Sequence, residues 1–231
     1  MPNALVTLTA IGVVLASCDT ALAQRPPSLA ELASYRGLHA TAARGDVGEI
    51  RRLARASTDL NSRDSNGRTP LHVAAFQGHG AAAQALIAAG AEPHFLDNQR
   101  YDAVTIAAVK DDLPTLQALL GAGASAKLVT SIYDGTALIA AAHLGHDGVV
   151  RELIRAGAPL DHINNLGWTA LIEAVILGNG GPRHIEAVRA LLEAGANPKI
   201  ADRNGTTPLQ HARQRGYAQM VTLIEAAQDR H

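Results

Sequence analysis

The sequence predicts an all-α solenoid, a row of about six stacked helix-turn-helix repeats joined by short β-hairpins. The first observation is the motif Thr69-Pro70-Leu71-His72, which returns at Thr207-Pro208-Leu209-Gln210. Weaker copies begin at Arg36, Asp102, Thr136 and Thr169, so the motif recurs at a nearly constant interval, with one longer step before Thr207. A period of about 33 residues is typical of arrays in which each unit packs only against its neighbours. The second observation is composition, because 47% of residues are hydrophobic but only 3% are aromatic, which suits closely packed helices.

One repeat, residues 64–96, shows how the elements follow in order. Asp64-Ser65-Asn66-Gly67 predicts the tip of a tight hairpin, since Asn-Gly tolerates positive φ. Thr69-Pro70 predicts the start of a first helix, with threonine as N-cap and proline at a position whose N–H needs no partner. A second helix is expected from about Gly80 to Ala89, and Gly90 ends it in the left-handed conformation. One such unit cannot bury its apolar face alone, so stacking must supply the core.

Further residues recur with this period: Ala74-Ala75, Gly78-His79, Gly145-His146, Gly157-Ala158, Gly195-Ala196-Asn197 and Asn204-Gly205. Together with Gly67 and the Thr-Pro-Leu-His motif, they give a pattern that resembles the ankyrin repeat family. The resemblance runs from about residue 31 to the end and implies units at 31–63, 64–96, 97–130, 131–163, 164–201 and 202–231. Residues 24–37 are expected to form a linker and an N-terminal capping helix, since Ser28-Leu29-Ala30-Glu31 is a capping-box pattern.

Three departures from the pattern stand out. The third unit has Arg100 where a turn glycine is expected, and the fourth shifts its glycine by one place, to Gly135. The fifth unit is longer than the others, and the additional residues fall within the glycine-rich stretch 178–184 between its two helices. Insertions in repeat proteins fall in loops and often carry function, although a tolerated surface insertion explains this one equally well.

The segment 1–23 is predicted to be a secretory signal peptide. The stretch from Ala4 to Cys18 is mostly apolar but too short for a comfortable membrane span, and Ala21-Leu22-Ala23 is a small-x-small cleavage pattern. The chain is therefore expected to be periplasmic, similar to secreted ankyrin repeat proteins of Gram-negative bacteria. An alternative stays open, because Leu15-Ala16-Ser17-Cys18 resembles a lipobox, in which Cys18 would be lipidated and anchor the protein at the membrane.

The charge balance excludes two classes of partner. Loss of residues 1–23 would remove one of the 21 acidic residues, Asp19, and none of the 20 Lys and Arg, so the mature chain would be neutral. Nucleic acids need a basic stripe, and an acidic membrane surface needs basic residues too. We expect neither partner, apart from a membrane reached through a lipid on Cys18. A monomer is expected, with self-association left open.

The family resemblance implies that a partner protein binds through the hairpin tips and the first helices, which line a concave groove. Counting equivalent positions from unit to unit places four of the seven aromatic residues of the mature chain in this groove. Tyr and Trp are enriched in interface hot spots. The predicted partner-binding residues are Phe76, Tyr101, Tyr133, His143, Leu166, Trp168 and Ile176. The alternative is that these rings pack against neighbouring hairpins.

No catalytic, cofactor or metal site is predicted. His39 and His72 occupy the repeat's own Leu-His position, where a bond to local backbone is the family role. His143 and His146 are close in sequence but have no further ligand nearby, and Asp111-Asp112 is better explained by the start of a helix. The sequence therefore predicts a non-enzymatic protein-interaction module of the periplasm. The alternatives are a small-molecule or metal-binding sensor and, within the interaction class, an immunity protein that neutralises a toxin.

Overall fold

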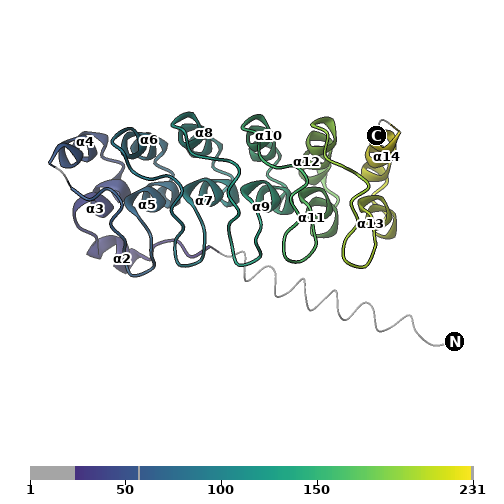
Figure 1. The fold of residues 1–231 in the computed structure, drawn as a ribbon, viewed down its shortest axis with the longest axis horizontal. Coiled ribbons are helices and arrows are strands. Elements are labelled where there is room, and N and C mark those ends of the chain that lie inside the picture. The colour runs from purple at the N-terminus through teal and green to yellow at the C-terminus, as the bar shows by residue number, and fades with distance from the viewer. Residues whose placement is uncertain (1–23, 57, 230–231) are drawn as a thin grey trace.

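The computed structural model describes residues 24–56 and 58–229, and in this part of the chain thirteen helices form a two-layered solenoid (Figure 1). The first helices of the six units form one row: α3 (Gly37–Arg44), α5 (Pro70–Gln77), α7 (Ala103–Val109), α9 (Ala137–Leu144), α11 (Ala170–Ile176) and α13 (Pro208–Gln214). The second helices form the other: α4 (Val47–Arg55), α6 (Gly80–Ala88), α8 (Leu113–Gly121), α10 (Asp147–Arg155), α12 (Pro182–Glu193) and α14 (Ala218–Gln228). Each helix packs against the next helix of its own row and against its partner within the unit. The predicted all-α solenoid is confirmed.

The connections between units are tighter than regular hairpins. Among the described residues the only β-bridge joins Thr130 and Gly135, and no strand forms. The other tips are short loops closed by two backbone hydrogen bonds, as from Asp97 N to Tyr101 O and from Arg100 N to Asp97 O, each at 2.9 Å. The predicted β-hairpins are therefore reduced to their turns.

The helices begin where the sequence predicts because side chains satisfy their first N–H groups. Thr69 and His72 form a capping box at α5, and Thr207 with Gln210 forms the equivalent at α13. In the third unit Asp102 replaces the threonine and accepts a bond from Thr105 N at 2.9 Å. A cap of this kind contributes about 1 kcal/mol, so the substitution preserves the start of the helix.

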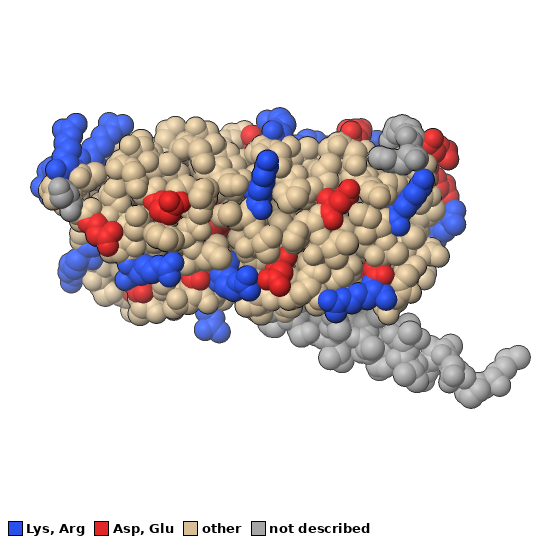
Figure 2. All heavy atoms as spheres, viewed as in Figure 1, with Lys and Arg blue, Asp and Glu red and all other residues tan. Residues whose placement is uncertain are grey.

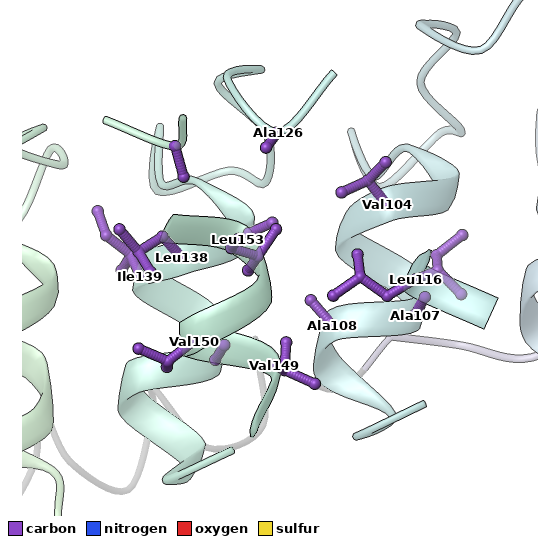
Figure 3. Close-up of a cluster of buried hydrophobic side chains, with 14 of the residues drawn as sticks. Val104, Ala107, Ala108, Leu116, Ala126, Leu138, Ile139, Val149, Val150 and Leu153 are labelled. Atoms are coloured by element: carbon purple, nitrogen blue, oxygen red, sulfur yellow. The ribbon is translucent and has the colours of Figure 1, made fainter. Parts of the chain in front are cut away.

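The core lies between the two rows and is continuous from unit to unit. Figure 3 shows its centre, where side chains of α7 and α8 face those of α9 and α10. Leu116, Leu138 and Leu153 are fully buried there, and Ala107 and Ala108 keep the helices close. Burying one leucine side chain contributes roughly 1.5–3 kcal/mol, so the interfaces between units supply the stability that a single unit lacks.

An N-terminal strap, residues 24–36, precedes the first unit and contains α2 (Leu29–Ser34). The predicted capping box is present, since Ser28 Oγ accepts from Glu31 N at 3.2 Å and Ser28 N donates to Glu31 Oε2 at 2.7 Å. The strap docks on the second unit, where Glu31 forms an ion pair with Arg68. Arg68 also pairs with Asp64 at 2.8 Å and is only 2% exposed.

Burial alone would raise the pKa of Asp64, but hydrogen bonds from Tyr35 and Arg68 outweigh it and hold that pKa below its ordinary value. The Tyr35 hydroxyl donates to Asp64 Oδ2 at 2.6 Å. Asp64 is therefore ionised at neutral pH and neutralises the buried guanidinium together with Glu31.

The insertion of the fifth unit is partly helical. Pro182, Arg183 and His184 form the first turn of α12, so only its glycine-rich beginning is a loop. Arg183 reaches back to pair with Asp111 of the third unit at 2.7 Å and with Asp147 of the fourth at 3.3 Å. The insertion thus ties three units together on the side of the second helices.

No helix in the described part is both long and apolar enough to cross a membrane. The expected signal peptide at 1–23 and the lipidation candidate Cys18 lie outside the described residues. On the face shown in Figure 2, basic and acidic side chains are interspersed, and Lys and Arg gather only over α4, whose exposed arginines include Arg51, Arg52 and Arg55.

Candidate functional site at the hairpin tips

Four of the tips are held by the side chain that opens the turn, and in the fourth unit Ser131 Oγ accepts from Tyr133 N at 3.2 Å instead. In the third unit Asp97 Oδ1 accepts bonds from Gln99 N at 2.9 Å and Tyr101 N at 3.0 Å. Asp64, Asn164 and Asp202 accept the same pair of bonds in the second, fifth and sixth units. An Asx side chain that bonds its own backbone two residues on is a standard stabiliser of turns. The tips are therefore preorganised.

Neighbouring tips are also bonded to one another. Asn98 N donates to Asn66 O at 2.9 Å, and Asn165 N donates to Tyr133 O at 2.9 Å. In the second to sixth units, one residue lies two places before the end of the turn. We call this set of five residues the tip row: Asn66, Gln99, Tyr133, Leu166 and Asn204. Backbone bonds thus join the second to the fifth tips, including Ser131 N to Arg100 O at 2.7 Å, and the side chain of Arg203 joins the sixth tip to the fifth.

The fourth tip departs from the others. It closes from Thr130 N to Gly135 O at 2.7 Å and so contains one residue more than its neighbours. Asp134 takes the left-handed conformation, with φ of 51°, where the second and fifth units use glycine. Arg100 does the same in the third unit, with φ of 64°, and pairs with Asp134 at 3.2 Å. The longer loop leaves the side chain of Ile132 56% exposed.

The structure divides the seven predicted partner-binding residues. Tyr133, Leu166 and Trp168 lie on the fourth and fifth tips and are partly exposed. The other four are buried, so their expected exposure is wrong: Phe76, Tyr101, His143 and Ile176. A partner cannot contact those four side chains without rearrangement, whereas binding at the first three stays a prediction.

The burial of these residues comes from the neighbouring unit, which periodicity does not reveal. Tyr101 holds the position that Gly135 holds in the next unit, and both residues line one small cavity at the boundary between the two units. His143 is covered by the fifth unit, where its Nδ1 lies 3.0 Å from Glu173 Oε2 and its carbonyl meets His184 Nε2 at 3.0 Å.

Glu173 is a residue that the sequence analysis missed. It is 3% exposed and lies on α11, at a helix position occupied by Val73, Ile106 and Ala140 in earlier units. Asn164 donates to its other oxygen at 2.8 Å. Both carboxylate oxygens are thus bonded, which a buried charge requires.

In the sixth unit the acidic side chain is on the turn and its partner is on the helix. Asp202 opens the turn, and its Oδ2 lies 2.9 Å from Nε2 of His211 on the helix. An aspartate at position 164 would place two acids side by side, so asparagine there follows from glutamate at position 173. Comparing the units position by position is the signal that could have found this pair.

A small cavity of about 20 Å³ lies under the fourth tip. Its lining consists of Tyr101, Thr105, Thr130, Ser131, Tyr133, Gly135, Thr136, Ile139, Ala140, Asn164, Leu166 and Glu173. This volume holds about one water molecule, whereas sites for small molecules measure roughly 300–1,000 Å³. The cavity therefore does not fit a metabolite.

The histidines that face other units bond to backbone. His39 Nε2 meets Arg68 O and His72 Nε2 meets Tyr101 O, each at 2.9 Å, so these backbone partners lie in the next unit, whereas local ones were expected. His72 also makes a local bond, which its Nδ1 accepts from Thr69 N at 3.1 Å. His146 Nδ1 meets Ala108 O at 2.9 Å, and His79 makes the corresponding bond to Ala43 O. Within the described residues no group of three or more His, Cys, Asp or Glu side chains could hold a metal ion.

Exposed apolar residues add to the candidate surface. Ile132 on the fourth tip and Leu144 at the end of α9 belong to the positions expected to line the groove, and both are exposed. Phe95, Val129 and Ile163 are exposed on the segments that lead into the turns and were missed. Their common place just before each turn, read across units, is the signal that could have identified them.

Comparison with known proteins agrees with this architecture. The family model described as ankyrin repeats (3 copies) matches residues 21–97 and 104–202, and a second ankyrin model matches 182–224. The putative ankyrin repeat protein YahD of Escherichia coli (strain K12) is 34% identical over 187 residues, covering 80% of this chain and 92% of that protein.

Solved structures show the same likeness. An ankyrin repeat domain from Acinetobacter baumannii AYE has a TM-score of 0.77 at 45% identity, covering 82% of this chain and 96% of that one. A complex of the predatory endopeptidase Bd0816 from Bdellovibrio bacteriovorus with the immunity protein Bd3460 contains a chain with a TM-score of 0.63 at 23% identity, covering 84% and 98%, a likeness of fold alone. The chain belongs to the ankyrin repeat family, whose repeats are non-catalytic scaffolds for protein–protein interaction.

Proposed function

We propose that this protein is a periplasmic interaction module that binds a partner protein through the fourth and fifth tips. We call this site the open tip surface and define it as Ile132, Tyr133, Leu166 and Trp168. The observation that carries the proposal is the exposure of Ile132, at 56%, on a loop that its neighbours hold in place. Because this loop is already held in place, a partner that binds its apolar surface loses little free energy to ordering the loop.

The surroundings of the open tip surface favour a protein partner. Arg100 of the third tip and Asp134 of the fourth tip pair with each other, and Arg203 of the sixth tip donates to Asn165 O on the fifth. Apolar and aromatic side chains ringed by polar groups are typical of protein interfaces, and Tyr and Trp dominate hot spots. The cavity beneath is too small for a metabolite, which counts against a sensor at this place.

The periplasmic part of the proposal rests on the apolar run and cleavage pattern within residues 1–23. A lipid on Cys18 remains the alternative for the same segment. A complex between an endopeptidase and an immunity protein contains a chain with this fold. A role in neutralising a toxin is the narrower form of the proposal.

The test is affinity capture from a periplasmic extract with the wild-type chain and with an Ile132→Asp, Leu166→Asp double variant. Both side chains reach solvent, so the fold should survive, which circular dichroism would check. Leu29→Asp is a matched control, because Leu29 is 86% exposed on the strap, away from the fourth and fifth tips. We expect one protein to be captured by the wild type and the control and lost with the double variant.

Equal capture by all three proteins would place the site elsewhere. A rise in Tm on addition of zinc or a metabolite, without any captured protein, would favour the sensor instead, since a ligand of the folded state stabilises it by mass action.

A further inference from the structure

The strap shows how a polypeptide segment lies on the tip row. Glu31 Oε1 accepts from Asn66 Nδ2 at 2.6 Å on the second tip, and Arg25 N donates to Gln99 Oε1 at 2.9 Å on the third. The strap therefore runs from the third tip back to the second. Residues 24–28 have no helical structure, so the part that leads onto the third tip is extended. In the view of Figure 1, α2 and the described residues before it cross the turns of the units that follow.

The tip row continues beyond the strap with a different chemistry. Its covered half is polar, with Asn66, Gln99 and the buried Arg68 meeting a carboxylate and backbone groups of the strap. Its open half begins with Tyr133 and Leu166, which are partly exposed and uncharged. A segment that lies on this half therefore meets apolar side chains.

A depression interrupts the open half at Gly135. The position that holds Arg68 in the second unit and Tyr101 in the third has no side chain in the fourth. The cavity of about 20 Å³ occupies this place, between Tyr133 and Leu166. A Cβ atom at Gly135 would lie 3.6 Å from Ser131 Oγ and 3.8 Å from Ile139 Cγ2, which are ordinary contacts. A methyl group therefore fits there, whether it comes from residue 135 or from a ligand.

We propose that the open half of the tip row binds an extended, uncharged segment of the partner, which continues the line of the strap and places one side chain of alanine or serine size in the depression at Gly135. This inference rests on the proposed function and specifies the form of the partner. The strap supplies the binding mode, because it already lies on the same row. The cavity volume supplies the size limit.

The charges around the depression exclude a charged side chain. The carboxylate of Glu173 lies at its floor and is fully bonded to His143 and Asn164. A second carboxylate would be repelled, and a lysine or arginine head is too large for the volume. A small uncharged group meets neither obstacle.

The experiment measures binding of two fluorescein-labelled peptides to the full chain by fluorescence anisotropy. Both have the background Lys-Ser-Val-Thr-Val-x-Val-Thr-Val-Ser-Lys, with x either alanine or glycine. The inserted methyl group should make the alanine peptide bind about fourfold more tightly than the glycine peptide. In Gly135→Ala the depression is filled, so this preference should disappear.

Gly121→Ala is the matched control. It makes the same change on α8, where an added Cβ meets no atom within 4 Å. The control should keep the wild-type preference, which separates filling the depression from a general effect of replacing glycine in this protein.

Three results would overturn the inference. The first is a preference for alanine that survives in Gly135→Ala. The second is no binding of either peptide up to about 1 mM. If capture of a protein nevertheless depends on Ile132 and Leu166, the proposed function stands, and the partner presents a folded surface and not an extended segment. The third is peptide binding only in a chain whose residues 1–23 are replaced by Gly and Ser, which would make the chain's own upstream segment the occupant. Loss of both peptide binding and dependent capture would remove the proposed function as well.

Discussion

His72 should make the stability of this protein fall in mildly acidic solution. The imidazole is buried on α5, where Nδ1 accepts a bond from Thr69 N at 3.1 Å and Nε2 donates to Tyr101 O at 2.9 Å. The first bond requires an unprotonated Nδ1, so the ring is neutral. Burial lowers the pKa of His72 from 6.5 to about 4.

The sign and size of the effect follow from linkage. Below pH 6.5 the unfolded chain takes up a proton at His72 while the folded chain does not, so the free energy of unfolding decreases. The loss continues until about pH 4, below which both states are protonated. At about pH 4.5 a shift of this size corresponds to a loss of about 2.5 kcal/mol.

The variant His72→Gln isolates this contribution. Gln210 occupies the same position in the sixth unit and accepts a bond from Thr207 N through Oε1 at 2.8 Å, so a glutamine can serve this cap without titrating. Urea unfolding would be followed by circular dichroism at about pH 7 and about pH 4.5 for both proteins. The wild type should lose about 2.5 kcal/mol more than the variant between these two conditions. Equal losses would refute the argument that burial holds His72 neutral.

Three further predictions concern arginines. Arg68→Met removes the partner of Glu31 while keeping an apolar stem, so the strap should detach. Because the detached strap is locally unfolded, trypsin should cut at Arg36 at least about tenfold faster. An unchanged rate of cleavage would contradict the docking role of Arg68. Arg100→Gly relieves a left-handed backbone at φ of 64° and should raise the free energy of unfolding, measured with urea, by about 1 kcal/mol. A lower free energy of unfolding in the variant would show that the loop is not strained. Arg183→Gln should cost less than about 1 kcal/mol because the side chain is half exposed, and the cost should vanish in about 1 M salt; a salt-independent loss would point to packing instead.

The helices were predictable because each is specified by residues within its own unit. Thr69-Pro70 and Thr207-Pro208 begin helices, glycines end them, and the period places the rest. The capping box of Ser28 and Glu31 was predictable for the same reason, since both partners lie within one helical turn. Local rules suffice where the determining contacts are local.

The candidate site depended on contacts between units, which no local rule contains. Tyr101 was expected at the surface and is buried against the following unit, where it lines a cavity together with Thr130 and Gly135. His143 is covered for a similar reason, through Glu173 on the next unit. The ion pair of Arg68 with Glu31 joins the second unit to the strap, far apart in the sequence. Repeat arithmetic gives a position within a unit but not the neighbour that covers it.

Several irregularities of this solenoid lie where we place the partner. Gly67 and Gly167 occupy the left-handed turn position of the second and fifth tips without strain. The two tips between them have Arg100 and Asp134 at this position instead. A left-handed non-glycine residue costs roughly 1–2 kcal/mol, somewhat less for aspartate. The same stretch holds the longer fourth loop, the exposed Ile132 and the buried Glu173. Because the units on either side place glycine at this position, stability does not explain the non-glycine residues here. Departures from local rules concentrate at functional sites. The third to fifth tips are therefore where a function should be sought first.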